Sequence, residues 1–433
     1  MKSAKVVVVT LWIISVPQVL VRPLLFFLGL DDPYPPELFS GPSWDLVARA
    51  QLIHLAWILL IAATHMAFSR PMVPVARLLP RAEGTSSRKI LVLAALVTTL
   101  IGAILTGLLL LRAGSVNALM YQAKVAHALA GHYVIREISV VGAIVAALAA
   151  LYYEKRYRES RALRGARLMV WICVSLFVVN LAFNYFWGNR YNIAMLLIAV
   201  VLGWHYYVKR LSVVRTVLVV VVLAVVLQTL KVIRNEGVEA VLARDVVIDQ
   251  PFWTDLSTSL HFSQFDALML ALRDGGERFA FRNGADFKNG LVAWIPRAIY
   301  PGKETFHVGG WFRRNYQPEK INGWPVTTMG DWYLNFGYWG ILLGAVVSGL
   351  AAAFFDAGYR HVRDSHWEAV VAPAVGLLIF DAGLDPGFVQ RTILVLVPIA
   401  ILAAALNVAE RMHVNRRRRH LRTDTRLSSR FVD

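Results

Sequence analysis

The stretch GWPVTTMGDWYLNFG, residues 323–337, decides the fold because the chain changes character within it. Turn-forming and hydrogen-bonding residues fill its first half, and an apolar segment then continues to about residue 355. A bilayer core requires about 20 consecutive apolar residues per helix. The segment 332–355 therefore predicts a membrane-spanning helix, with a polar and aromatic stretch at its edge.

The composition extends this prediction to the whole chain. Of the 433 residues, 57% are hydrophobic and 17% are charged, and the mean hydropathy is +0.53. A water-soluble chain of this length does not have that balance, so we expect an all-α polytopic membrane protein with about ten transmembrane helices. The ten predicted spans are 6–28, 47–67, 90–111, 135–153, 168–187, 191–208, 212–230, 332–355, 367–384 and 391–409.

The basic residues predict the orientation of these spans. The formal net charge of +17 is compatible with nucleic-acid binding. However, most basic residues lie on alternate loops, and the cytoplasmic loops of membrane proteins carry an excess of Lys and Arg. They are Lys2, Lys5, the 68–89 and 154–167 loops, Lys209, Arg210, Arg215, Arg360, Arg363 and the RRRR run at 416–419. We therefore expect both termini in the cytoplasm, the bilayer as partner and no nucleic acid. Binding of anionic lipid or RNA by the tail is the alternative.

The predicted spans divide the chain into four parts. Residues 1–230 hold the first seven helices, 231–331 form a large outward-facing loop, 332–409 hold the last three helices, and 410–433 form a basic cytoplasmic tail. The first span carries Arg22 and is too long for the apolar core of a signal peptide, so we expect it to remain as a helix.

Two outward loops have helical patterns. In the large loop, apolar residues recur at helical spacing against Ser, Gln and Asp, which predicts an amphipathic helix at the membrane surface. These residues are Leu256, Leu260, Phe265, Leu268, Met269 and Leu272. The 112–134 loop is also compatible with a surface or re-entrant helix.

Several arginines on the outward side depart from the charge rule. They are Arg190, Arg234, Arg297, Arg313, Arg314 and Arg391. An arginine in hydrocarbon is costly unless it is paired or hydrated, whereas its planar fork of donors fits a phosphate or carboxylate. Several arginines at one leaflet indicate an anionic, lipid-linked ligand. The alternative is that each one extends to the phospholipid headgroups.

Other motifs give no metal or cofactor site. His127 and His132 are five residues apart and point about 140° away from each other on a helix. The PGKE stretch at 301–304 lacks the first glycine of a phosphate-binding Walker loop, since that position is Arg297. No Cys and His residues have zinc spacing, so we expect neither a metal nor a cofactor.

An acidic pair, Asp31 and Asp32, follows the first predicted span. Its placement resembles that of acidic residues in polyprenyl-phosphate-sugar-dependent glycosyltransferases, in which a carboxylate acts as a base or binds a divalent metal. A solvated, turn-rich loop is the alternative.

The order of four short stretches resembles a known family. GNR at 188–190 opens a helix, IRNEG at 233–237 follows the next one, IPRAIYPGK lies at 295–303, and PVTTMGDWYLNFGYWG at 325–340 leads into the eighth span. Over about residues 170–345 this succession resembles the Wzy-type O-antigen and exopolysaccharide polymerases of bacteria. That family has a Gly-x-Arg turn, an Arg after the following helix, a Pro-containing segment and a T-x-x-G-E-x-Y-x-N-F-G stretch. Asp331 stands where the family more often has Glu.

The resemblance implies an enzyme of the bacterial cytoplasmic (inner) membrane. It would transfer a growing glycan from undecaprenyl diphosphate to a hydroxyl of a new lipid-linked repeat unit on the outer face. Arg190, Arg234 and Arg297 would stabilise the diphosphate leaving group. The activated donor requires no cofactor, and a chain-length regulator and a flippase are the further partners implied.

The resemblance also implies roles for residues near the eighth span. The candidates for the base that deprotonates the acceptor hydroxyl are Asp331, His307 and Glu304, and the remaining substrate-binding candidates are Arg313, Arg314, Trp324, Tyr333 and Asn335. Trp324 and Tyr333 would offer sugar-stacking faces, and Asp331 and Asn335 would share one helix face. An interfacial aromatic belt with a capped helix is the alternative for this stretch.

Three other functions remain open. An O-antigen ligase would use the same leaving group, and a polyprenyl-phosphate-sugar-dependent glycosyltransferase would use Asp31 and Asp32. A transporter would need a polar path, but apart from Arg136 and Glu137 near an outer edge, the predicted spans carry few charges at their centres.

Overall fold

The computed structural model describes residues 20–30, 32–33, 38–39, 43–78, 89–124, 133–159, 164–188, 190–209, 211–212, 264–295, 299–302, 308–319, 323–362 and 383–398, with single positions between 215 and 229 and between 400 and 412. Within these residues the regular structure is helical, and the only β-type pairing is an isolated bridge between Gly275 and Phe279.

Five helices of the described part are long and apolar enough to cross a membrane. They are α3 (Trp44–Phe68), α5 (Lys89–Ala113), α7 (Tyr133–Glu159), α8 (Arg164–Phe186) and α16 (Thr328–Val362). They correspond to five predicted spans, which are 47–67, 90–111, 135–153, 168–187 and 332–355. The prediction of an all-helical chain with membrane-length apolar helices is confirmed at this level.

The other five predicted spans are described only in part or lie outside the described residues. The span predicted at 191–208 forms a shorter helix, α9 (Arg190–Gly203), followed by the π-helix η3 (Trp204–Val208). The end of the first predicted span contains α2 (Arg22–Phe27). Helix α18 (Pro386–Arg391) ends where the last predicted span begins, and the start of that span forms the π-helix η4 (Thr392–Leu396). Most of 212–230 and all but two residues of 367–384 are outside the described residues.

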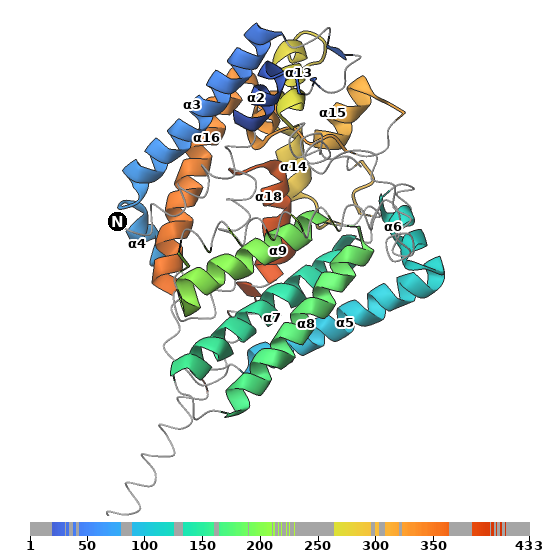
Figure 1. Ribbon diagram of the computed structural model, residues 1–433, viewed down its shortest axis with the longest axis vertical. Coiled ribbons are helices and arrows are strands. Elements are labelled where there is room, and N and C mark those ends of the chain that lie inside the picture. The colour runs from blue at the N-terminus through green and yellow to red at the C-terminus, as the bar shows by residue number, and fades with distance from the viewer. Residues whose placement is uncertain are drawn as a thin grey trace, which may run out of the picture.

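Helices α3 and α16 pack side by side and run in the same direction (Figure 1). Near the start of α3, Arg49 bonds to Tyr338. Near its end, His65 Nε2 lies 3.9 Å from Asp356 Oδ2. Close approach is possible because α16 has Gly349 where a Cβ would come within 2.6 Å of the α3 side chain at Thr64. The short α4 (Met72–Ala76) contacts α16 as well.

Helices α5, α7 and α8 form a second bundle, joined by buried polar side chains. Asn180 Nδ2 on α8 donates to Thr99 Oγ1 on α5 at 2.7 Å, and Asn184 Nδ2 donates to Ser139 Oγ on α7 at 3.0 Å. Asn192 Nδ2 of α9 donates to Asn184 Oδ1 at 3.2 Å. Such hydrogen bonds hold helices together in hydrocarbon. They therefore attach the first turn of α9 to this bundle.

The segment predicted as the large loop contributes three helices, which lie in the upper half of the view (Figure 1). These are α13 (Gln264–Asp274), α14 (Ala285–Leu291) and α15 (Val308–Tyr316). We call the described residues from 264 to 327 the cap. The 112–134 loop forms α6 (Val116–Lys124), a helix that its sequence pattern predicts.

Helix α13 does not lie where the sequence predicts. The helix exists from Gln264 onward, but every residue from Phe265 to Leu272 is buried, so no face of that stretch is free for the membrane surface. Asp266, on the expected polar side, is fully buried and bonds to Arg22 of α2, with a distance of 2.7 Å between Arg22 Nη2 and Asp266 Oδ2. The polar face of α13 therefore binds an arginine from the first predicted span and does not face water.

A sharp kink divides α16 into two arms. Gly337 has φ 64° and ψ −150°, a conformation that is essentially limited to glycine. The short arm, 328–336, folds back along the long arm, 338–362, and places the Trp332 ring against Gly344. The kink also frees backbone carbonyls at the end of the short arm. The N–H groups of Arg282 and Asn283 donate to the carbonyls of Leu334 and Asn335 at 2.9 Å each.

Replacing Gly337 by alanine should destabilise the protein by about 1–3 kcal/mol, the usual cost of such a backbone conformation in another residue. The new Cβ would also lie 3.2 Å from the Phe281 ring. Thermal unfolding in a mild detergent measures the change. Gly107→Ala in α5 is the matched control because its Cβ would meet no atom within 4 Å, and alanine favours a helix interior. Equal midpoints for both variants would contradict the role given to the kink.

Candidate functional site

The structure describes part of the predicted site. Arg313 and Arg314 lie on α15, Trp324 lies in the segment before α16, and Asp331, Tyr333 and Asn335 lie on the short arm of α16. Arg190 begins α9, and only its backbone is described. The remaining predicted residues, Arg234, Arg297, Glu304, His307 and Asp31, lie outside the described residues.

The turn that carries Arg190 is built from α8 and α9. Gly188 has φ 62°, and its N–H donates to the carbonyl of Tyr185 at 2.7 Å, which closes the end of α8. Glycine adopts this left-handed conformation without the steric penalty of other residues. Because Asn192 bonds to Asn184, the backbone at Arg190 is fixed against α8 from both sides of the turn.

Around Asn335 the short arm is joined to the cap by a buried polar network. Asn335 Nδ2 donates to Asp286 Oδ2 at 3.0 Å and to the carbonyl of Asp331 at 2.8 Å. Arg282 donates to both oxygens of Asp286, at 2.6 and 2.9 Å, and its guanidinium carbon lies 4.7 Å from the centre of the Trp311 ring. Asn335 does lie on the Asp331 side of the helix, but its amide is committed to protein groups.

Asp331 lies in the first turn of the short arm. Its N–H donates to the carbonyl of Thr327 at 2.9 Å, and 9% of the residue is exposed. Asp331 is therefore largely buried beneath the protein surface. Of the three base candidates, it is the one within the described residues.

Trp324 and Tyr333 do not offer ring faces to a sugar, contrary to the sequence prediction. Trp324 is 0% exposed, and its ring packs against Phe312 and Tyr316. Tyr333 is also buried, with its ring edge-on to Phe281 and its hydroxyl 3.4 Å from the carbonyl of Gly275. Trp324 thus packs inside the cap against α15, and Tyr333 packs the short arm against the cap.

The aromatic residues after the kink behave differently. Trp339 is 80% exposed and Tyr338 is 48% exposed, as expected of an interfacial aromatic belt. The belt interpretation therefore fits the start of the long arm and does not fit the stretch before Gly337.

The two arginines of α15 have different environments. Arg313 is buried, and its guanidinium carbon lies 5.4 Å from the centre of the Trp324 ring. Arg314 is exposed. Arg314 is therefore accessible to a ligand, whereas the Arg313 guanidinium packs inside the cap.

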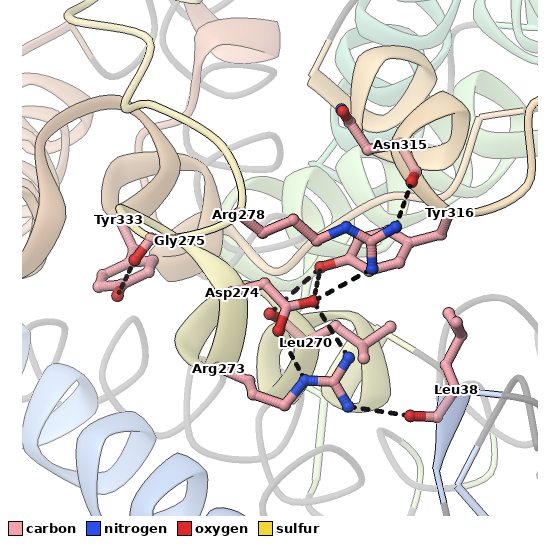
Figure 2. A network of polar contacts seen from close by, with 9 residues as sticks. All are labelled: Leu38, Leu270, Arg273, Asp274, Gly275, Arg278, Asn315, Tyr316 and Tyr333. Carbon is pink, nitrogen blue, oxygen red and sulfur yellow. Dashed lines mark hydrogen bonds and ion pairs between the residues drawn. The ribbon is translucent and has the colours of Figure 1, made fainter.

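A second polar network surrounds Asp274 at the end of α13 (Figure 2). Arg273 Nε donates to Asp274 Oδ1 at 2.6 Å, and the Tyr316 hydroxyl donates to Asp274 Oδ2 at 2.7 Å. Arg273 Nη1 also donates to the carbonyl of Leu38 at 2.9 Å. The Asp274 cluster thus connects α13 with α15 and with Leu38, which lies between α2 and α3.

Asp385 is a further carboxylate close to the short arm. It caps α18 by accepting from the N–H of Phe388, and the preceding carbonyl, of Leu384, accepts from Trp332 Nε1 at 2.6 Å. Burial raises the pKa of Asp385 above its usual value, although the charge of Arg391 and backbone N–H groups act in the opposite direction.

Asp385 gives a pH-dependent prediction. Because its pKa is raised in the folded state, the unfolded chain loses this proton at lower pH, and stability should fall as pH rises above about 4. Asp385→Asn keeps a capping side chain and should remove this fall. At pH 7 we expect the variant to have a higher melting temperature than the wild type. At about pH 4 we expect the two melting temperatures to be equal. A constant difference between them across this range would contradict the assignment.

Sequence reasoning missed Arg22, Asp266, Asp274, Arg282 and Asp286. The i, i+4 spacing of Arg282 and Asp286 is a usable signal for an ion pair. Arg22 and Asp266 are 244 positions apart, and no local pattern joins them.

Known proteins offer no guide to this site. Comparison of the chain with models of protein families, with curated proteins and with solved structures gives no match. In the described part of the chain, no group of three or more His, Cys, Asp or Glu residues could hold a metal ion.

Proposed function

We propose that the chain is a polymerase of undecaprenyl-diphosphate-linked oligosaccharide repeat units, of the Wzy type that its motifs resemble. The observation that best supports this is the fold of 323–337. The stretch that resembles the family motif is packed between the cap and the long arm of α16, with Asn335 held in a polar network that includes Asp286 and the backbone carbonyl of Asp331. A lipid-facing aromatic belt has no need of that arrangement.

The proposal includes about ten spans, with the cap on the outer face. Since α3 and α16 are parallel, the chain crosses the membrane an odd number of times between them, and α5, α7 and α8 with 191–208 and 212–230 satisfy this. Leu384 bonds to Trp332 near the start of α16, whereas Val362 is the last residue of that helix, and we assign a further span to 367–384 on this ground. The chain then spans the inner membrane of a bacterium, with its basic loops on the cytoplasmic side.

In this proposal the arginines act on the leaving group. Negative charge grows on the diphosphate as the anomeric C–O bond breaks, and preorganised cations in a partly water-excluded site stabilise it. Arg190, Arg234 and Arg297 take this role. Arg22, Arg273 and Arg282 are less suited to this role, because each already bonds to a carboxylate of the protein.

The acceptor hydroxyl loses its proton to a carboxylate or imidazole of the same side, and general-base catalysis of this kind contributes typically about 10²–10⁴-fold. Asp331, Glu304 and His307 remain the candidates. A chain-length regulator and a flippase belong to the proposal as partners.

Two tests distinguish the polymerase from the competing polyprenyl-phosphate-sugar-dependent glycosyltransferase. One mutates the acidic pair, Asp31 and Asp32, and the other removes divalent metal. We expect a strain carrying Asp31→Asn and Asp32→Asn to keep full-length glycan ladders on gels. In membranes supplied with lipid-linked repeat units, polymerisation should also survive a metal chelator. Loss of product under both conditions would favour the glycosyltransferase over the polymerase.

A further inference from the structure

Arg278 in the Asp274 cluster carries a charge that Asp274, its ion-pair partner among the described residues, does not fully neutralise. The oxygens of Asp274 already accept from Arg273 Nε, Arg273 Nη2 and the Tyr316 hydroxyl, at 2.6, 3.1 and 2.7 Å. Arg278 Nη1 lies 3.7 Å from Asp274 Oδ2, which is longer than a hydrogen bond. Two guanidinium groups therefore share one carboxylate, and a positive charge remains (Figure 2).

The protein nevertheless holds Arg278 in place. Its guanidinium carbon lies 4.7 Å from the centre of the Tyr316 ring, and its Nη2 donates to the carbonyl of Asn315 at 3.1 Å. Within the described part of the chain, Nε and Nη1 make no hydrogen bond, and the side chain is 49% exposed. A guanidinium fixed on one side with donors on the other is preorganised for an oxyanion.

The charges of the cluster persist over the ordinary pH range. Burial tends to raise the pKa of Asp274, but bonds from Arg273 and Tyr316 and the charges of Arg273 and Arg278 together lower it. Burial and the bond to Asp274 raise the pKa of Tyr316, so the phenol stays neutral. Glu277, which precedes Arg278 in the sequence, is exposed, so water and salt screen its charge.

We propose that Arg278, with Arg273 behind it, forms a binding subsite for a phosphate or carboxylate oxyanion. Two sources share this chemistry, the headgroup of an anionic phospholipid and an acidic group on a soluble or glycan ligand. The subsite does not depend on the polymerase reaction, because its residues are distinct from those assigned to the leaving group.

The test is equilibrium dialysis of radiolabelled inorganic phosphate against the full-length protein in an uncharged detergent at low ionic strength. We expect Arg278→Gln to bind one equivalent fewer than the wild type. Lys288→Gln, which removes an exposed charge from α14 of the same cap, should bind as the wild type does. Arg278→Lys keeps the charge without the planar fork, and its affinity at this subsite should be roughly tenfold weaker.

An unchanged number of bound equivalents in Arg278→Gln, or no phosphate binding by the wild type, would overturn the proposal. If Arg278→Gln does not fold, Arg278→Lys carries the test, and wild-type affinity in it has the same meaning. Repeating the dialysis in nanodiscs with and without phosphatidylglycerol assigns the source. Competition by this lipid in the wild type identifies the headgroup, and its absence identifies a soluble or glycan-borne oxyanion; either result retains the subsite.

Discussion

Asp266→Ala is expected to lower the free energy of unfolding by about 3–5 kcal/mol, the effect of leaving one member of a buried ion pair without its partner. Arg22 and Asp266 are both fully buried. Arg22 donates to Asp266 through Nε and Nη2, and Nη2 also donates to the carbonyl of Asp32 at 3.0 Å. Denaturant titration in micelles measures the change.

A surface pair provides the matched control. On α7, Arg158 Nε lies 2.6 Å from Glu154 Oε1, but the arginine side chain is 46% exposed. Glu154→Ala should therefore cost roughly 0.2–1 kcal/mol. The double variant Arg22→Leu with Asp266→Leu should recover much of the loss, because no buried charge remains. A loss in Asp266→Ala no larger than in Glu154→Ala would mean that the pair does not join α2 to the cap.

Arg234→Ala and Arg297→Ala are each expected to abolish long glycan chains while leaving the protein expressed. Removal of one preorganised donor from an oxyanion site typically costs about 10²–10³-fold in rate, which is enough to prevent repeated additions. Gel electrophoresis of surface glycan, with immunoblotting of membranes, measures both quantities.

Arg112→Ala is the control for these variants. Arg112 is exposed in the last turn of α5, on the same side of the bundle as the Arg190 turn, and has no assigned role. We expect its ladder to match the wild type. Normal ladders in both Arg234→Ala and Arg297→Ala would remove the idea that arginines hold the diphosphate.

Hydropathy predicts the long helices because burial in a bilayer requires an uninterrupted apolar run, as in α5 and the long arm of α16. Helical spacing likewise predicts α13. Neither signal indicates what a helix packs against. The pattern of α13 is that of an amphipathic helix with its polar face in water. That prediction is wrong because Asp266 on the polar face bonds to Arg22, which comes from the other end of the chain.

The candidate site shows the same division. The sequence identifies 323–337 as a special stretch, since glycines and an aspartate at the edge of an apolar run are unusual. It does not predict the reversal at Gly337, which depends on the fit of the Trp332 ring against Gly344. Trp324 and Tyr333, which precede the reversal, are buried, whereas Trp339, which follows it, is exposed. Residue type alone does not distinguish an aromatic ring that faces lipid from one that faces protein.

The most direct test of the central claim is to delete the gene and examine the length of surface glycan by gel electrophoresis. The polymerase proposal predicts single capped repeat units in the deletion strain and a restored ladder after complementation with the wild-type gene but not with Arg297→Ala. Complete loss of attached glycan would indicate a ligase instead. Unchanged glycan length would contradict the account.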